Sequence, residues 1–186
     1  MSHNRSERII LGIDPGTVIL GFGLIVCGGK APGLITMGVL KLQKLPDPLA
    51  RLGKIYERIS SLIDEYQPAE VAVEAPFFGK NVQSMLKLGR AQGVALAPAI
   101  SRNIPIFEYA PRKIKQSITG NGNASKEQVS AMVQNILKFK ETPDYLDATD
   151  GVAVALCHYY QSERPVSVPG AKSWAEFIRK NPDRIR

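Results

Sequence analysis

The pattern of hydrophobic positions begins with an uncharged run, Ile9 to Ile13, that ends on the carboxylate of Asp14. A half-exposed strand would alternate with polar residues, so this unbroken run predicts a strand buried on both faces. Pro15 and Gly16 follow directly, a pair that favours a type II turn with a positive φ at the glycine. We therefore expect a central strand over residues 8–14, with its terminal carboxylate at the rim of the core.

Two further strands and a helix are predicted next. Short apolar or alternating runs at residues 20–26 and 34–42 are bounded by Gly and Pro, which indicates a three-stranded meander with the first strand. Asp47 and Pro48 then match the N-cap and N1 preferences of a helix. Apolar residues recur at helical spacing from there until Pro68, so this helix should cover one face of the sheet.

After this helix the chain alternates strands and helices. Residues 70–74 predict a short apolar strand that ends on Glu74, as the first strand ends on an acid. Residues 80–102 predict a long helix that is interrupted at Pro98. The run 104–109 predicts a fifth strand, and its proline favours an edge position or the first residues of the strand.

Three helices complete the predicted core. Pro111 starts a short one, and Ser125 with Gln128 makes a capping box for the second. A last helix is expected from Asp144, which would be its N-cap, to about residue 161.

The last helix carries two acids, Asp147 and Asp150, at i, i+3 spacing. This spacing places both carboxylates on one face of the helix, while Val152 and Leu156 belong to an apolar face. Taken alone, the two acids are explained equally well by the helix dipole, which favours negative charge near the N-terminus. Asp14 alone is likewise explained as a cap that accepts hydrogen bonds from turn amides.

Considered together, the four acids indicate a shared cation site and not four separate local roles. Asp14 and Glu74 should end neighbouring parallel strands, and Asp147 and Asp150 can converge on the same rim of the sheet. Carboxylates so crowded repel one another and stay ionised together only if a divalent cation neutralises them. Hard oxygen ligands suit Mg²⁺ or Mn²⁺, and a pair of such ions can promote phosphodiester hydrolysis. The pattern therefore favours a metal-dependent hydrolytic site.

The length of the chain indicates one domain, and its charge distribution indicates a polyanionic partner. A chain of 186 residues with 44% hydrophobic residues fits one domain and a tail. The net charge of +7 is unevenly distributed, because residues 1–78 balance eight basic against eight acidic side chains, whereas residues 79–140 carry ten basic and two acidic ones. Such a basic block favours a polyanion through counterion release, although a solvated basic face would have the same composition.

Membrane insertion and secretion are not indicated, because the chain has no apolar run of about 18 residues and its first residues are polar. We expect a cytoplasmic protein that does not bind membranes. Cys27 and Cys157 are far apart without a second pair, so we expect buried thiols. The predicted organisation is a disordered N-terminus over residues 1–7, one domain over 8–161, and a linker with a short helix over 162–186.

Five short motifs in unbroken order carry a family resemblance. They are Gly12-Ile-Asp-Pro-Gly-Thr17, Val73-Glu-Ala-Pro-Phe-Phe78 with Lys80-Asn81, Leu88-Gly-Arg-Ala-Gln-Gly93, Phe107-Glu-Tyr-Ala110 with Lys115-Gln116, and Asp147-Ala-Thr-Asp150. As a set covering residues 8–161 they resemble the RuvC family of crossover junction endodeoxyribonucleases, although each motif by itself is unspecific.

The resemblance implies a ribonuclease-H-like α/β fold, with a five-stranded mixed sheet (an antiparallel meander plus two parallel strands) flanked by helices. It implies a structure-selective endonuclease that resolves four-way DNA (Holliday) junctions by paired symmetric nicks in recombination and repair. The implied cofactor is Mg²⁺, two ions per active site, with Mn²⁺ as a substitute. The implied partners are four-way junction DNA, a second copy of the chain in a homodimer, and a branch-migration motor complex.

The functional residues of the family map onto this chain one by one. Its catalytic and metal-binding acids fall on Asp14, Glu74, Asp147 and Asp150, of which position 147 varies between family members. Its basic helpers near the scissile phosphate fall on Lys115 and Lys126. The expected DNA contacts are Phe77, Lys80, Asn81, Lys87, Arg90, Arg112, Lys113, Lys115 and Lys126.

Two of these expectations concern the stretch after the second acid. By resemblance, Phe77 stacks on a base or wedges a base step apart at the crossover, with core burial as the alternative. On the following helix, Gly89, Gly93 and Ala97 recur every four residues. This stripe would let a second copy approach closely at a symmetric dimer interface, or would equally allow tight packing on the sheet.

Three other functions are compatible with parts of the pattern. Sugar-kinase and actin-like ATPases share the Gly-Ile-Asp-x-Gly-Thr hairpin, but they need a second, duplicated domain that 186 residues without a second such hairpin do not supply. A catalytically silent junction-binding protein would keep the basic block and lose acids, whereas all four acids are present. Ribonuclease-H-like nucleases that act on RNA or hybrids are closer competitors, and the substrate distinguishes them.

Overall fold

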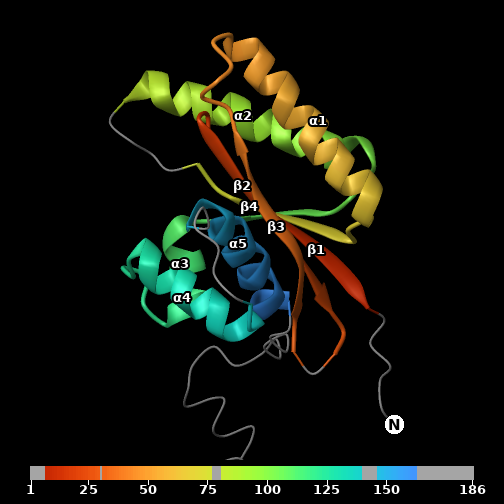
Figure 1. Ribbon diagram of the computed structural model, residues 1–186, viewed down its shortest axis with the longest axis vertical. Coiled ribbons are helices and arrows are strands. Elements are labelled where there is room, and N and C mark those ends of the chain that lie inside the picture. The colour runs from red at the N-terminus through yellow and green to blue at the C-terminus, as the bar shows by residue number, and fades with distance from the viewer. Residues whose placement is uncertain (1–6, 30, 77–80, 140–145, 163–186) are drawn as a thin grey trace, which may run out of the picture.

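The computed structural model describes residues 7–29, 31–76, 81–139 and 146–162 (Figure 1). The strands in this part of the chain are β1 (Arg8–Asp14), β2 (Ile19–Cys27), β3 (Gly33–Lys41), β4 (Glu70–Glu74) and β5 (Ile106–Tyr109). They form one sheet in the order β3-β2-β1-β4-β5, antiparallel from β3 to β1 and parallel from β1 to β5. The predicted meander plus two parallel strands is confirmed, as is the edge position of the fifth strand.

β1 lies at the centre of the sheet, as its apolar run predicts. Ile10, Leu11 and Ile13 are fully buried. β1 pairs with β2 on one side and with β4 on the other, where Ile13 lies beside Val73 in parallel register. β1 ends at the next residue, Asp14, and β4 ends at the next residue, Glu74. The two acids therefore leave the sheet at the same edge.

Helices cover both faces of the sheet. They are α1 (Pro48–Tyr66), α2 (Val82–Ser101), α3 (Pro111–Thr119), α4 (Lys126–Leu137) and α5 (Leu146–Ser162). α1 and α2 share a core with Leu11 and Ile13, while α3, α4 and α5 share a second core with Ile10 and Ala72 on the opposite face. None of the helices in the described ranges is both long and apolar enough to span a membrane.

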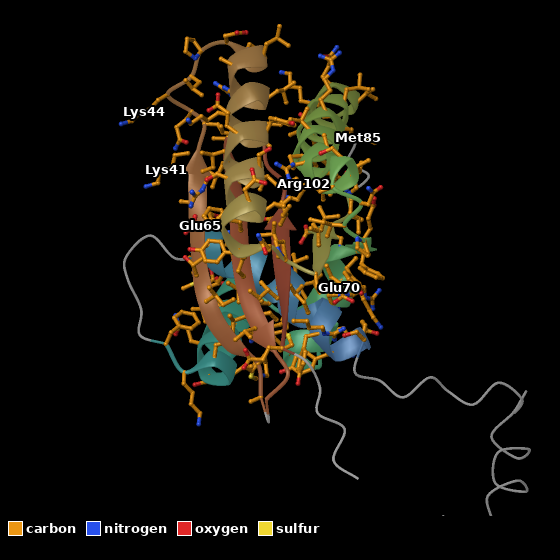
Figure 2. The ribbon with its side chains drawn as sticks, turned by 90° about the vertical axis from the view of Figure 1, so that its right-hand side faces the viewer. Lys41, Lys44, Glu65, Glu70, Met85 and Arg102 are labelled. Atoms are coloured by element: carbon orange, nitrogen blue, oxygen red, sulfur yellow. The ribbon has the colours of Figure 1, made fainter. Side chains whose placement is uncertain are left out.

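α1 and α2 lie against each other on their face of the sheet (Figure 2). At the end of α2, Arg102 donates hydrogen bonds of 2.9 Å from Nε and Nη2 to the two carboxylate oxygens of Asp64 on α1. Arg102 also donates from Nη1 to the carbonyl oxygen of Pro98 at 3.0 Å. This pairing ties the two helices together at the end of α2.

Local sequence signals set the helix starts as predicted. Asp47 caps α1, because its carboxylate oxygens accept the N–H groups of Leu49 at 3.0 Å and Ala50 at 3.1 Å. At α4, Ser125 and Gln128 each accept a hydrogen bond from the backbone N–H of the other, so the predicted capping box is confirmed. The predicted cap of α5, Asp144, lies outside the described residues.

Two local predictions were wrong. Pro98 does not interrupt α2, because it lies in the last turn, where its missing N–H removes one hydrogen bond close to the helix end. Gly16 does not adopt a positive φ; in the described chain Gly28 and Gly120 are the glycines that do. Gly16 is required for space instead, since a Cβ there would lie 1.8 Å from the carbonyl oxygen of Ile19. The chain after Asp14 therefore turns without the expected type II geometry.

α5 also differs from its prediction, which assigned it one apolar face. All residues from Gly151 to His158 are buried. Glycines allow this helix to lie directly on the strand backbones, because a Cβ at Gly12 would lie 2.1 Å from the carbonyl oxygen of Gly151, and one at Gly21 would lie 2.2 Å from that of Asp147. The beginning of α5 is thereby held against the ends of β1 and β2.

The far half of α5 is held by a buried polar group. His158 is 2% exposed, so its ring nitrogens need partners inside the protein. Nδ1 lies 2.7 Å from the hydroxyl of Tyr109, and Nε2 lies 3.1 Å from Oε2 of Glu70. These contacts link α5 to β4 and β5. Cys27 and Cys157 are buried thiols, as predicted.

Candidate active site

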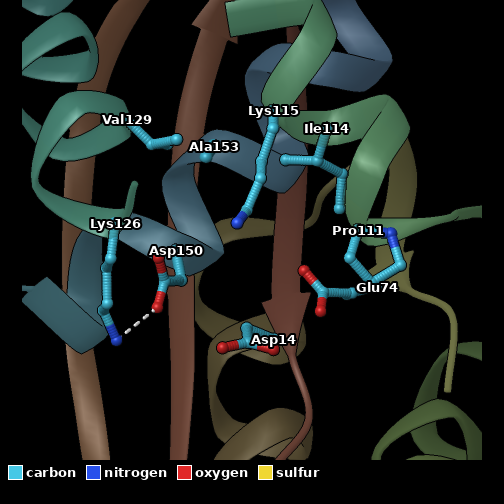
Figure 3. A pocket seen from close by; sticks show the side chains of 9 residues that line it. All are labelled: Asp14, Glu74, Pro111, Ile114, Lys115, Lys126, Val129, Asp150 and Ala153. Atoms are coloured by element: carbon cyan, nitrogen blue, oxygen red, sulfur yellow. Dashed lines mark ion pairs between the residues drawn. The ribbon is translucent and has the colours of Figure 1, made fainter. Parts of the chain in front are cut away.

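A cavity of about 360 Å³ opens where the central parallel strands end (Figure 3). Its acidic lining residues come from three elements: Asp14 ends β1, Glu74 ends β4, and Asp150 lies in the second turn of α5. Lys115 of α3 and Lys126 of α4 also line the cavity and supply positive charge beside the acids. The remaining lining is Pro111, Ile114, Val129 and Ala153. The structure thus brings together three of the four predicted acids and both predicted basic helpers.

The parallel register and the close packing of α5 explain this convergence. Asp14 and Glu74 end strands that pair in parallel, so both side chains reach the same edge. Asp150 is followed by Gly151, where a Cβ would lie 2.5 Å from Cα of Phe22 on β2. A side chain at position 151 would push α5 away from the sheet and Asp150 away from the strand acids.

Asp147 joins the site through Lys126 and is not part of the cavity lining. Nζ of Lys126 lies 2.5 Å from Oδ1 of Asp147 and 2.7 Å from Oδ2 of Asp150. The side chain of Asp147 is 42% exposed, compared with 23% for Asp150. Lys126 therefore bridges the two acids of α5, and Figure 3 shows its ammonium at the side of the cavity beside Asp150.

Burial and mutual repulsion raise the pKa values of the strand acids. Burial, followed by repulsion from Asp150, raises the pKa of Asp14 to about 7. Burial, followed by repulsion from Asp14, raises the pKa of Glu74 to about 8. Burial also raises the pKa of Asp150, against the hydrogen bond from Lys126, which lowers it. A metal-free site therefore retains protons on its strand acids near neutral pH.

For Lys126, hydrogen bonds affect the pKa more than burial does. Burial lowers its pKa, but its hydrogen bonds to Asp147 and Asp150 outweigh burial and raise the pKa to about 12. The ammonium is consequently charged throughout the physiological range.

The donor set fits a hard divalent cation in its chemistry. Asp14, Glu74 and Asp150 offer half-buried carboxylate oxygens, the ligands that Mg²⁺ and Mn²⁺ prefer. Among the residues that the structure describes, however, no three Asp, Glu, His or Cys side chains are already arranged to hold a metal ion.

The other predicted DNA contacts lie elsewhere or outside the described chain. Arg112 and Lys113 are exposed on α3, the helix that carries Lys115. Oδ1 of Asn81 accepts the N–H of Ser84 at 3.1 Å and so caps α2. Phe77 and Lys80 lie outside the described residues.

Lys87 and Arg90 line a second cavity, of about 320 Å³, which lies between α1 and α2 and contains no acid in its lining. Arg51 of α1 also lines this cavity, and sequence reasoning missed it. Its Nε donates to the carbonyl oxygen of Leu45 at 2.6 Å, and its Nη1 donates to that of Thr17 at 3.3 Å. Arg51 thereby supports the loop that follows Asp14.

The glycine stripe of α2 faces away from the sheet. Gly89 and Gly93 are exposed, and a Cβ at either position would meet no described atom within 4 Å. The alternative interpretation of these two glycines, tight packing on the sheet, is therefore wrong. Ala97 is half-buried. The assignment of the stripe to a dimer interface stays a prediction.

Sequence reasoning also missed a residue beneath the strand acids. Gln92 of α2 is 7% exposed and donates from Nε2 to the carbonyl oxygen of Glu74 at 3.5 Å. It lines a small cavity of about 60 Å³ together with Asp14 and Glu74. Its helical spacing with Ala95 and Ala99, both buried, was the available signal, since it places a polar group on the apolar face of the helix.

Comparison with known proteins identifies the family. The family model described as "Crossover junction endodeoxyribonuclease RuvC" matches residues 10–158. Curated proteins of that name are similar along nearly the full chain. The one from Cytophaga hutchinsonii is 59% identical over 97% of this chain and 89% of its own length, and the one from Porphyromonas gingivalis is 54% identical over 97% and 98%.

Solved structures agree with this result. Thermus thermophilus RuvC in complex with Holliday junction substrate covers 83% of this chain and 94% of its own, at 33% identity and a TM-score of 0.77. The yeast mitochondrial Holliday junction resolvase Ydc2, at 13% identity and a TM-score of 0.58, supports the fold alone. With its ribonuclease-H-like sheet and its strand-end acids, the chain belongs to the RuvC family of crossover junction endodeoxyribonucleases.

Proposed function

We propose that this chain is an endonuclease that resolves four-way DNA (Holliday) junctions in recombination and repair. The observation that carries the proposal is the cavity in which Asp14, Glu74 and Asp150 meet Lys115 and Lys126, in a member of the RuvC family. The Thermus thermophilus relative, solved with a Holliday junction substrate, supports the same substrate here.

The acids are the proposed metal ligands. Asp14, Glu74 and Asp150 would hold Mg²⁺, with Asp147 as a further ligand, and we propose two ions per site with Mn²⁺ as a substitute. Bound there, Mg²⁺ would activate the attacking water and offset the charge that develops on the scissile phosphate. Asp14 and Glu74 release their retained protons when a cation stabilises their charged forms, so metal affinity should rise with pH.

The basic side chains position the DNA backbone. Lys115 extends from α3 into the cavity, close to the side chains of Glu74 and Asp150 (Figure 3). Lys126 lies beside Asp150, with which it forms an ion pair. A phosphate in the cavity would therefore lie near two ammonium groups, which offset the repulsion between the phosphate and the acids. Arg112 and Lys113, exposed on α3, extend the positive charge outside the cavity.

Junction opening is assigned to Phe77, which follows Glu74 by three residues. Stacking on an unpaired base is worth ~1–3 kcal/mol and would offset part of the unstacking at the crossover. Phe77→Ala should fold and bind Mg²⁺ but cut intact junctions far more slowly, and a junction with unpaired bases at its centre should recover much of the rate. Equal loss on both junctions, with a lowered Tm, would show that Phe77 belongs to the core.

We also propose a homodimer, because two symmetric nicks need two related active sites. The exposed Gly89 and Gly93 on α2 support this position for the contact, since another backbone can approach them without a clash within the chain. A branch-migration motor complex is the further partner that the family resemblance suggests.

The direct test compares substrates. The full chain is incubated with a mobile four-way junction, a linear duplex and an RNA–DNA hybrid, with Mg²⁺ or with EDTA, and the nicks are mapped. We expect paired nicks at symmetric positions in the junction, dependent on Mg²⁺, and little cutting of the other two substrates. Equal or preferred cutting of the hybrid would contradict the proposal in favour of an RNA-directed nuclease.

A further inference from the structure

Lys126 occupies the place where the two acids of α5 would otherwise repel each other. Its Nζ lies 2.5 Å from Oδ1 of Asp147 and 2.7 Å from Oδ2 of Asp150, so it forms an ion pair with each of them. The two acids are one helical turn apart, so their carboxylates lie on the same side of α5. One ammonium therefore compensates both of them.

The strand side of the cavity lacks this compensation. Neither Asp14 nor Glu74 forms an ion pair within 4.0 Å with any residue that the structure describes, although both line the same cavity as Lys126. A divalent cation can thus approach the strand acids without displacing a protein cation. At the acids of α5 it would compete with the ammonium of Lys126.

The ammonium of Lys126 can move away from Asp147 and Asp150. Its side chain is 38% exposed, and its ammonium is the end of a flexible four-carbon stem, so it can turn outward without disturbing the core. A DNA phosphate in the cavity offers a substitute anion for the ammonium. Phosphate and carboxylates therefore compete for Lys126, just as Lys126 and a metal ion compete for the carboxylates.

We propose that Lys126 is an internal competitor for the metal ion: it occupies Asp147 and Asp150 in the free protein and releases them when a DNA phosphate binds its ammonium. The inference rests on the proposed function of the same site. Its consequence is that complete metal loading is coupled to DNA binding, so the free protein is incompletely loaded. By linkage, DNA must raise metal affinity by the same factor by which metal raises DNA affinity.

Lys115 provides a matched control. It lines the same cavity and carries the same charge, but it forms no ion pair with a described acid within 4.0 Å. General electrostatic repulsion of a metal ion would be relieved by neutralising either lysine. Competition by contact would be relieved by neutralising Lys126 alone.

The test measures Mn²⁺ binding by calorimetry to the full chain without DNA. The proteins are the wild type, Lys126→Met and Lys115→Met, since methionine keeps an unbranched side chain and removes the charge. We expect Lys126→Met to bind Mn²⁺ at least about tenfold more tightly than the wild type, because even one of its two charge-assisted contacts is worth about that factor, and Lys115→Met to gain clearly less. Equal gains in the two variants, or no gain in Lys126→Met, would overturn the proposal.

Melting temperatures distinguish competition between Lys126 and the metal ion from a role of Lys126 in folding alone. Without Lys126 the acids of α5 repel each other, so Lys126→Met should melt below the wild type in EDTA and should be stabilised by Mn²⁺ more than the wild type is. A lysine that only supports the fold would lower both melting temperatures equally, and this result would overturn the proposal.

Adding a four-way junction tests the coupling itself. With Ca²⁺ as the ion, and with gels to verify that the DNA stays intact, the junction should raise the metal affinity of the wild type and leave that of Lys126→Met nearly unchanged. An equal rise in both proteins would count against release by phosphate. The DNA-free titrations do not depend on junction cleavage, so a chain that failed to cut junctions would refute the proposed function and leave the competition measurement standing.

Discussion

The acids at the strand ends and the acids of α5 are all carboxylates, but their negative charge is compensated in two different ways. Asp14 and Glu74 end parallel strands, are half-buried, and have pKa values raised to about 7 and about 8. Asp147 and Asp150 begin α5 and share the ammonium of Lys126. A carboxylate at this site therefore either retains a proton near neutral pH or is paired with Lys126, and which of the two it is depends on the element that carries it.

The comparison shows how a fold can keep a crowded acidic site stable before its metal arrives. Four ionised carboxylates at one sheet edge would repel strongly in a partly buried site. Here protons compensate the strand side and a lysine compensates the helix side. Both kinds of compensation are reversible, so a metal ion can replace them.

The largest expected effect comes from removing a strand acid. Glu74→Gln keeps the size of the side chain but loses a ligand oxygen and the negative charge, so cleavage should fall by more than ~100-fold, beyond the loss typical of residues that only support a metal ligand. Junction binding should be unchanged or tighter, because removing negative charge cannot weaken phosphate binding by itself. Single-turnover nicking and gel-shift titration measure the two quantities. Normal nicking by Glu74→Gln would remove Glu74 from the site.

The second-largest effect is expected from a substitution in the close contact between α5 and β2, which holds Asp150 near the strand acids. Gly151→Ala puts a Cβ 2.5 Å from the backbone of Phe22, which forces α5 away from β2. We expect a loss of about 3 kcal/mol of unfolding free energy, or roughly 6–12 °C in Tm, and weaker metal binding by what remains folded.

Gly53→Ala is the matched control, because Gly53 is an exposed helical glycine on α1 whose added Cβ would meet no described atom within 4 Å. It should stabilise the protein by about 0.5–1 kcal/mol through helix propensity. Urea unfolding of both variants checks the prediction. Equal effects at the two positions would show that the contact between α5 and β2 is not close.

A smaller effect follows from pH. Because the folded-state pKa values of Asp14 and Glu74 lie above their ordinary values of 3.8 and 4.5, the native state holds more protons than the unfolded state between those values and about pH 8. The free energy of unfolding should therefore fall in EDTA as pH rises through this window. Each pKa unit is worth at most ~1.4 kcal/mol, and solvent screening of two half-buried groups reduces the total to on the order of 1–3 kcal/mol. Saturating Mg²⁺ should flatten the slope.

Glu74→Gln is the control for this slope, because it lacks one of the two titrating groups and should show a shallower dependence. The comparison between variants is needed because burial lowers the pKa of His158, which contributes with the opposite sign below its ordinary value of 6.5. Urea unfolding from pH 5 to 9 measures both proteins. Identical slopes would mean that Glu74 is ionised in the folded, metal-free state.

The smallest effect on stability is expected at a glycine outside the cavity. Gly93→Leu adds a side chain where a Cβ meets no described atom, so Tm should stay the same or rise slightly. If α2 forms the dimer interface, the variant should sediment as a monomer and nick one strand without pairing the second nick. A wild-type monomer at micromolar concentration would remove this hypothesis.

Some features could be predicted from the sequence because their causes are local. The uncharged run before Asp14 requires a strand buried on both faces, and β1 is central. Asp47-Pro48 and the pair Ser125 and Gln128 define helix starts through contacts within one turn. Pro98 and Gly16 were misjudged for a related reason: their local preferences are real, but position in the last turn and the approach of Ile19 decided the outcome.

Other features depended on tertiary structure because residues distant in the sequence produce them. The spacing of Asp147 and Asp150 was visible, but their partner Lys126 comes from α4 and bridges both only because α4 packs against α5. Gly12, Gly21 and Gly151 are unremarkable singly, and they matter because they let α5 lie on two strand backbones. The raised pKa values of Asp14 and Glu74 arise in the same way, since burial and repulsion exist only after three separate elements have met at one edge of the sheet.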